Sequence, residues 1–312
     1  MNTPPTVSLV LGSGGARGLA HIGVIRWLEA NGFAIRSVAG ASMGALIGGI
    51  HAAGELDAFE NWVRALGQTD VLRLLDFAWK PSALFKGERV IATLKGLIGE
   101  RDIEDLAIGF TAVATDIEAQ KEVWLNRGPL FDAIRASIAV PTLFTPYEIN
   151  GRRLLDGGLV NPVPIAPTLG DGTDFTIVVD VAGPRESVTP PAAVVPVDPS
   201  ATAAGRAQPV AVLADYQRRI GAFIDEVQAK FGVESSNQIG LVDVIQGSFE
   251  TMQGIVTRFK LAAYTPDAII TIPRDAARAF EFHRAAELIE RGRREAEQAL
   301  GHLVQAPPPR QT

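Results

Sequence analysis

A strand–turn–helix pattern that occurs twice in the first 53 residues constrains the fold more than any other feature. The apolar, β-branched run 7–12 ends in clustered glycines and is followed by residues with helical spacing, 16–30. A second run, 35–40, leads directly into a nearly all-apolar segment, 43–53, which is too short to cross a membrane. Short buried strands that alternate with helices are typical of a parallel sheet covered on both faces.

Further apolar runs extend this pattern along the chain. We expect strands at residues 109–116, 121–125, 152–156, 175–181 and 268–272. The sequence therefore predicts an α/β fold with a mainly parallel central sheet. With 312 residues the chain is long enough to bury a sizeable core, as one large domain or two smaller ones.

Composition excludes several functional classes. The net charge of −6 leaves no basic footprint, so we expect no nucleic-acid partner. The chain has no cysteine, which excludes disulfides, thiolate metal sites and a cysteine nucleophile. Residues 1–6 lack the charged and apolar regions of a signal peptide, and no apolar run is long enough to span a bilayer. We expect a cytoplasmic protein, with peripheral membrane contact left open.

One region departs from the strand–helix alternation. Residues 184–210 are rich in Pro and Ala and predict a flexible excursion with little core of its own. Residues 211–231 then carry apolar side chains at helical spacing, which indicates either a helix packed on the domain or a lid-like, membrane-docking helix. Its polar face mixes acids and bases, unlike the cationic face of a lipid-surface helix. The tail 305–312 is expected to be disordered.

The glycine cluster at 10–20, VLGSGGARGLA, presents backbone N–H groups as an anion-binding loop would. A dinucleotide-binding loop needs a third glycine, but Arg17 stands at that position when the count starts from Gly12 and Gly14. The second strand also ends at 38–40 without an acid to hold a ribose, and the P-loop pattern fails as well. The remaining interpretations are a tight structural turn and a site for a transient oxyanion.

Ser42 is the candidate nucleophile. It lies in Gly40-Ala41-Ser42-Met43-Gly44, which matches the Gly-x-Ser-x-Gly nucleophile elbow between a strand and a helix. Gly40 and Gly44 would relieve the crowding at so sharp a turn, and the helix N-terminus would favour a negative oxygen. A serine that only caps the helix is the alternative.

Ser42 needs a base, and histidine is the first residue type to consider. The chain has four: His21, His51, His283 and His302. His51 lies more than two turns along the helix that begins at Ser42. His283 and His302 are the two that could complete a triad in the order serine, acid, histidine, but neither follows a strand or a glycine-rich loop. A histidine-dependent esterase remains an alternative.

Asp156 is the better candidate for the base. It ends the predicted strand 152–156 and is followed by Gly157 and Gly158, which would let the backbone approach another element closely. Partial burial would raise the proton affinity of the carboxylate toward that of a general base. An ordinary Asp-Gly-Gly turn is the alternative.

The motifs GSGGARG, GASMG and DGG, in this order, resemble the patatin-like phospholipase family, in particular its small bacterial members. The resemblance implies a three-layer α/β/α sandwich and hydrolysis of acyl esters by a Ser–Asp dyad without histidine. It implies Ser42 as nucleophile, Asp156 as base, and a loop through Gly14, Gly15 and Arg17 as oxyanion hole.

The resemblance covers most of the chain and implies a single hydrolase domain over 1–312. The family loop often carries glycine where Ser13 stands, which leaves open whether Ser13 shifts the oxyanion hole by one residue. An acyl lipid is the expected partner, and no metal or other cofactor is expected because no acidic cluster accompanies the motifs. A weakly catalytic protein that binds acyl lipids is a further alternative.

Overall fold

The computed structural model describes residues 3–74, 87–141, 143–186 and 241–305. By its internal contacts the chain divides into two compact units, residues 1–186 with 245–312, and residues 187–244. The second unit lies almost entirely outside the described residues, and so do the predicted helix 211–231 and nearly all of the predicted excursion 184–210. The single-domain assignment therefore stays a prediction.

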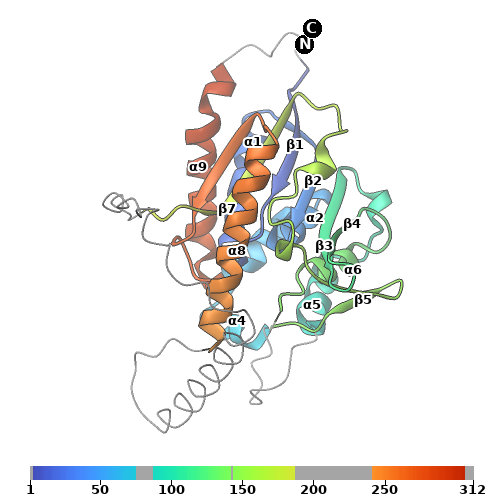
Figure 1. The fold of residues 1–312 in the computed structure, drawn as a ribbon. Coiled ribbons are helices and arrows are strands. Elements are labelled where there is room, and N and C mark those ends of the chain that lie inside the picture. The colour runs from blue at the N-terminus through green and yellow to red at the C-terminus, as the bar shows by residue number, and fades with distance from the viewer. Residues whose placement is uncertain (1–2, 75–86, 142, 187–240, 306–312) are drawn as a thin grey trace, which may run out of the picture. The chain divides into compact units, whose positions relative to one another are not determined.

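An eight-stranded sheet forms the centre of the first unit (Figure 1). Its strand order is β5-β6-β3-β2-β1-β7-β8, and β4 pairs with β3 beside this path. The strands are β1 (Thr6–Leu11), β2 (Ala34–Ala41), β3 (Gly109–Asp116), β4 (Lys121–Leu125), β5 (Tyr147–Ile149), β6 (Arg152–Asp156), β7 (Phe175–Gly183) and β8 (Ala268–Pro273).

The sheet is parallel from β3 through β2, β1 and β7 to β8. The other three pairings, β3 with β4, β3 with β6 and β5 with β6, are antiparallel. Because parallel strands end at one edge, the loops that follow β1 and β2 lie next to each other. In register, Leu11 at the end of β1 stands beside Gly40, two residues before Ser42.

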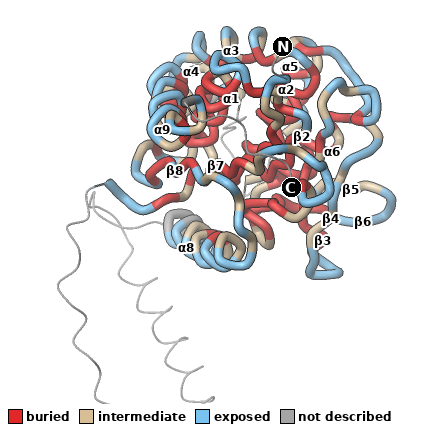
Figure 2. The backbone as a smooth tube through the Cα atoms, turned by 90° about the horizontal axis from the view of Figure 1, so that it is seen from above, coloured by how far each residue is buried: buried red, intermediate tan, exposed pale blue. Residues whose placement is uncertain are grey.

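Helices cover both faces of the sheet. The α-helices are α1 (Ala20–Ala30), α2 (Met43–Ala52), α3 (Leu56–Ala65), α4 (Gln68–Leu74), α5 (Glu88–Ile98), α6 (Leu130–Ser137), α8 (Leu241–Ala263) and α9 (Ala285–Gln305). Short 3-10 helices are η1 (Gly15–Leu19), η2 (Ile103–Asp105), η3 (Gly157–Leu159), η4 (Ala166–Thr168) and η6 (Phe282–Arg284). Figure 2 shows α8 on one side of β7 and β8, and α1, α3 and α9 on the other.

Alternation along the strands sets the two layers of the core. Leu9 and Leu11 of β1 belong to the large apolar cluster that also includes buried residues of α1, α2 and α9. Val10, between them, faces the opposite layer and packs in a smaller cluster with Val178, Val163 and Ile165. Leu261 near the end of α8 packs against this smaller cluster. These two layers and the sheet form a three-layer α/β/α sandwich, as the family resemblance implies.

Most predicted elements agree with the structure to within two residues, and the strands 109–116, 121–125 and 152–156 agree at both ends. The expected helix 16–30 begins instead with the 3-10 turn η1, which starts at Gly15 with a positive φ of 55°. His283 lies in η6, just before α9 begins. β5 was not predicted. In the described ranges, no helix combines the length and apolar character needed to cross a membrane.

Candidate active site

Ser42 occupies a strained turn between β2 and α2. Its φ of 55° and ψ of −122° are unusual for a residue with a side chain, and strain of this kind gathers at functional sites. The flanking glycines make the turn sterically feasible: a Cβ on Gly44 would lie 2.0 Å from the carbonyl oxygen of Leu11, and one on Gly40 would lie 2.4 Å from the Gly44 carbonyl carbon. A strained turn of this kind between a strand and a helix is typical of a nucleophile elbow.

The side chain of Ser137, at the end of α6, anchors this turn. Its buried hydroxyl accepts a hydrogen bond from the Ser42 backbone N–H at 3.0 Å and donates one to the Val113 carbonyl of β3 at 2.6 Å. Ser137 therefore ties the strained elbow to the sheet. Sequence analysis did not identify it.

Asp156 lies at the end of β6 and is completely buried. Its backbone N–H donates to the Ala139 carbonyl at 3.0 Å, and its own carbonyl accepts from the Thr115 hydroxyl at 2.8 Å. The backbone then passes directly over β3, where a Cβ on Gly157 would lie 2.0 Å from the Val113 oxygen. Val113 and Thr115 of β3 thus help to position both candidate catalytic residues, Val113 through Ser137 and Thr115 by its bond to Asp156.

Burial raises the pKa of the Asp156 carboxyl to about 7. The Ser42 hydroxyl and the Gly158 N–H act in the opposite direction, because both donate to the charged form and lower this pKa. The Gly158 N–H donates to Asp156 Oδ1 at 2.7 Å. Among the described residues, Oδ2 has no hydrogen-bond partner.

The glycine loop after β1 offers two backbone donors. The N–H groups of Gly12, Ser13 and Ala16 donate to the carbonyls of other segments, at 3.0 Å, 2.8 Å and 2.8 Å. In the part of the chain that the structure describes, no acceptor faces the N–H of Gly14 or Gly15. The Ser13 N–H already donates to the Pro162 carbonyl, so among the first loop residues it is the Gly14 and Gly15 amides that are left as candidate donors.

The Arg17 guanidinium links this loop to two other segments of the chain. It is buried, and its Nη1 donates to the Arg274 carbonyl at 2.9 Å, while Nη2 lies 3.4 Å from the Glu250 carboxylate of α8. These contacts hold Arg17 against neighbouring segments and are consistent with a positioning role for it.

The histidines lie elsewhere. His21 is buried beneath the glycine loop, where its Nε2 is 2.8 Å from the Gly12 oxygen and burial lowers its pKa to about 4. The Nδ1 of His51 lies 3.8 Å from Glu29. His283 lies in η6 and His302 in the last turn of α9. Among the described residues, no hydrogen bond or ion pair joins a histidine to Ser42.

Sequence analysis also missed the structural roles of two further residues at the site. Gln253 of α8 is buried and donates to the Ser13 hydroxyl at 3.1 Å, and His21 fixes Gly12 as described above. The position of His21, one turn after the glycine loop on a buried helix face, could have indicated its contact with Gly12 from the sequence. Gln253 is 240 residues from Ser13 in sequence, and no local pattern links them.

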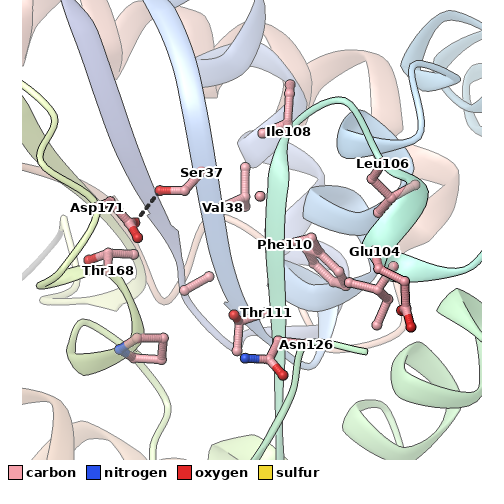
Figure 3. Close-up of a pocket in the computed structure, with 14 residues that line it drawn as sticks. Ser37, Val38, Glu104, Leu106, Ile108, Phe110, Thr111, Asn126, Thr168 and Asp171 are labelled. Atoms are coloured by element: carbon pink, nitrogen blue, oxygen red, sulfur yellow. Dashed lines mark hydrogen bonds between the residues drawn. The ribbon is translucent and has the colours of Figure 1, made fainter. Parts of the chain in front are cut away.

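A cavity of about 300 Å³ lies away from this site, near the start of β3 (Figure 3). Ser37, Thr111, Asn126 and Asp171 contribute to its lining, and the Ser37 hydroxyl donates to the Asp171 carboxylate. Ser42 and Asp156 are not among the lining residues. Within the described ranges, no group of three His, Asp or Glu side chains gathers as metal ligands would.

Comparison with known proteins gives a consistent family match. The family model "Patatin-like phospholipase" matches residues 9–169. An uncharacterized NTE family protein of Mycobacterium bovis is 38% identical over 333 residues, which cover 96% of this chain and 92% of that protein. A lysophospholipase of Candida glabrata is 30% identical over 183 residues, which cover 56% of this chain but 10% of the relative.

A mouse protein, patatin-like phospholipase domain-containing protein 6, is 32% identical over 195 residues, covering 59% of this chain and 14% of its own length. Among solved structures, VipD from Legionella pneumophila aligns with a TM-score of 0.46 and 12% identity, covering 95% of this chain and 66% of that chain.

Proposed function

Because the chain belongs to the patatin-like phospholipase family, we propose that it is a lipid hydrolase that cleaves acyl esters with Ser42 as nucleophile and Asp156 as general base. One observation carries the proposal: a serine in a strained elbow interacts with a fully buried carboxyl group whose pKa is about 7. A carboxylate with this proton affinity can accept a proton near neutral pH and return it.

The first half of the reaction forms an acyl-enzyme. Ser42 Oγ attacks the ester carbonyl carbon while the Asp156 carboxylate takes the hydroxyl proton. The carbonyl oxygen becomes an oxyanion, to which the Gly14 and Gly15 amides donate. When the tetrahedral intermediate collapses, the ester C–O bond breaks and Asp156 gives its proton to the departing alkoxide, which leaves as an alcohol.

The second half releases the acid. Water attacks the acyl carbon while Asp156 takes one of its protons, and the same two amides stabilise the second oxyanion. Collapse breaks the bond to Ser42 Oγ, which recovers its proton from Asp156. Each preorganised donor in such a hole typically contributes about 10²–10³ in rate.

The names of the relatives indicate the substrate class. The curated relatives include a lysophospholipase and patatin-like phospholipase domain proteins, so we propose an acyl ester of a phospholipid or lysophospholipid as substrate. The proposed oxyanion donors are uncharged backbone amides and the proposed base is an aspartate, so no fixed positive charge contacts the reacting carbonyl. The proposed site therefore does not require a charged headgroup, and neutral glycerides should be tested beside the phospholipids.

Hydrolysis of a fluorogenic acyl ester tests the dyad. Ser42→Ala and Asp156→Asn should each lower turnover by at least about 10³-fold, because each removes a group that takes part in the reaction itself. Ser8→Ala is the matched control, since Ser8 is also buried but forms hydrogen bonds with Thr173 and Asp171 beside the Figure 3 cavity.

Circular dichroism and thermal unfolding of all three variants should show a folded protein. Near-wild-type turnover of either Ser42→Ala or Asp156→Asn would contradict the proposed dyad. His283→Ala and His302→Ala should keep activity, and its loss in either one would favour the histidine-dependent alternative.

A further inference from the structure

The outward face of α8 is apolar. Four large side chains at helical spacings of seven, three and four residues are exposed, by 40%, 54%, 42% and 73% respectively: Ile245, Met252, Ile255 and Phe259. We call these four residues the α8 stripe. Scattered exposed apolar residues are common, but several large ones on one face of a single helix are typical of an interaction surface.

The inward face of the same helix is largely polar and contacts the loops of the candidate active site. Gln253 donates to the Ser13 hydroxyl at 3.1 Å, and a Cβ on Gly158, two residues after Asp156, would lie 2.2 Å from its Nε2. Glu250 lies 3.4 Å from Arg17, and Lys260 lies 3.8 Å from Glu122. Toward the end of α8, apolar residues pack inward: Leu261, and Tyr264 just beyond the helix, contact the smaller core cluster.

This arrangement reverses the usual polarity of a surface helix, which buries its apolar stripe and exposes its polar one. The polar contacts to Ser13, Arg17 and Glu122 hold α8 in an orientation that presents the stripe to the outside. Figure 2 shows the helix at the outside of its layer, with most of its residues exposed or intermediate in burial.

We propose that the α8 stripe enters the surface of the lipid aggregate from which the substrate is drawn. The proposal rests on the proposed function, because the chemistry needs access to a water-insoluble ester. No member of the stripe is charged, and Arg258, an exposed residue beside it, is cationic, as suits an anionic headgroup layer.

The short distance between the α8 stripe and the candidate active-site loops also favours a lipid surface as the partner of the stripe. A helix with its side chains is about 10–12 Å across. A lipid surface in contact with the α8 stripe therefore lies within about one helix diameter of Ser13 and Gly158, on the loops that carry the proposed oxyanion donors and base. The contacts through Gln253 and Glu250 would couple lipid contact to the position of these loops.

The absence of cysteine from the chain makes a site-specific test straightforward. Single variants Met252→Cys and Phe259→Cys, labelled with the polarity-sensitive fluorophore NBD, report contact with lipid at the stripe. Val304→Cys is the matched control: Val304 is 46% exposed, apolar and helical, but lies on α9 in the opposite layer.

Vesicles of phosphatidylcholine and phosphatidylglycerol should shift NBD emission to the blue and raise it severalfold at 252 and 259, but not at 304. In a sedimentation assay, the pair Met252→Ser and Phe259→Ser should reduce vesicle binding at least tenfold, and Val304→Ser should leave it unchanged. Equal responses at all three labelled sites, or none at 252 and 259, would overturn the proposal.

Two other occupants of the stripe give distinct results. A blue shift that follows protein concentration without lipid would identify a second copy of the chain, and failure of the folded protein to react with the NBD reagent would show that the chain itself covers the stripe. Either result overturns lipid docking.

Turnover of a soluble short-chain ester by the wild-type protein is measured in parallel, so that the two proposals are tested independently. Absence of turnover contradicts the proposed function, whereas the lipid-docking proposal is judged by vesicle binding at the stripe alone.

Discussion

The carboxyl group of Asp156 determines the pH range in which the proposed dyad can work. Buried carboxylates are unfavourable because the charged form loses its hydration, and the pKa rises as a result. At Asp156 the rise is limited by two donors, the Ser42 hydroxyl and the Gly158 N–H. The balance gives a pKa of about 7, which leaves a useful fraction of base at neutral pH.

We therefore predict the shape of the pH–rate profile. Only ionised Asp156 can accept the Ser42 proton, so kcat/KM should rise about tenfold per pH unit below pH 7 and level off above it. Stopped assays with a soluble ester across this range check the profile. A flat profile from about pH 5 to about pH 8 would exclude Asp156 as the titrating base.

Ser137 provides a second residue-scale prediction. Ser137→Ala removes the acceptor of the Ser42 N–H and loosens the elbow, so kcat should fall by about 10- to 100-fold. The control Ser8→Ala also loses a buried hydroxyl at one end of the sheet. Both variants should lose about 1–3 kcal/mol of unfolding free energy.

Kinetics separates the two roles of a buried serine. If Ser137 serves only the stability of the fold, both variants would retain the same kcat once folded. A lower kcat in Ser137→Ala alone, measured on protein shown to be folded, would establish that the hydroxyl positions Ser42.

At the level of elements, two glycines allow α1 and α9 to cross closely. A Cβ on Gly292 of α9 would lie 1.9 Å from the Ala20 oxygen, and one on Gly23 of α1 would lie 1.8 Å from the Ile289 oxygen. Neither position tolerates a side chain without moving a backbone. This crossing fixes the layer behind β1 and therefore the loop that leads into α1.

We predict opposite effects for two glycine substitutions within α9. Gly292→Ala should lower the free energy of unfolding by about 1–3 kcal/mol through steric overlap. Gly301→Ala, where nothing lies within 4 Å of the added Cβ, should raise it by up to about 1 kcal/mol through helix propensity. Urea titrations followed by circular dichroism measure both. Equal effects of the same sign would show that the crossing is not tight.

The elements show which parts of the fold can be predicted from sequence. Strands such as β3 and β4 were placed correctly because each is a sustained β-branched or alternating run. β5 has three residues and was missed, although the hairpin turn that joins it to β6 carries the signal Asn150-Gly151, both with positive φ. The turn η1 was expected to be α-helical, since spacing alone does not separate the two helix types over five residues.

The residues of the candidate site can also be predicted from the sequence only in part. Ser42 and Asp156 stand out because each lies at the end of a strand beside glycines, and the structure brings the two residues into interaction. Ser137 and Gln253 contact the site from 95 and 240 residues away, through bonds that only the folded chain creates. Local patterns therefore identify the proposed reacting groups but not the residues that position them.

For the whole molecule, two buried groups give stability opposite dependences on pH. Asp156 has a folded pKa of about 7, above its ordinary 3.8, so the folded protein binds the extra proton and this contribution falls as pH rises from about 4 to 7. His21 has a folded pKa of about 4, below its ordinary 6.5, so its contribution is lost as pH falls through that interval.

Replacing Asp156 should isolate one of these dependences. The unfolding free energy of Asp156→Asn minus that of wild type should be near zero at pH 4 and grow to at most about 4 kcal/mol above pH 7, at about 1.4 kcal/mol per tenfold change in proton affinity. Urea unfolding across this range measures the difference. A constant difference would show that the Asp156 pKa is not raised by folding.

The most direct measurement of the central claim is the mass of the protein after reaction with a fluorophosphonate, followed by peptide mapping of the adduct. We predict one adduct per chain, located on Ser42, absent from Ser42→Ala and strongly slowed in Asp156→Asn, with His283→Ala and His302→Ala reacting like wild type. No adduct on the folded wild-type protein, or an adduct on another residue that persists in Ser42→Ala, would contradict the assignment of Ser42 and Asp156 as the catalytic pair.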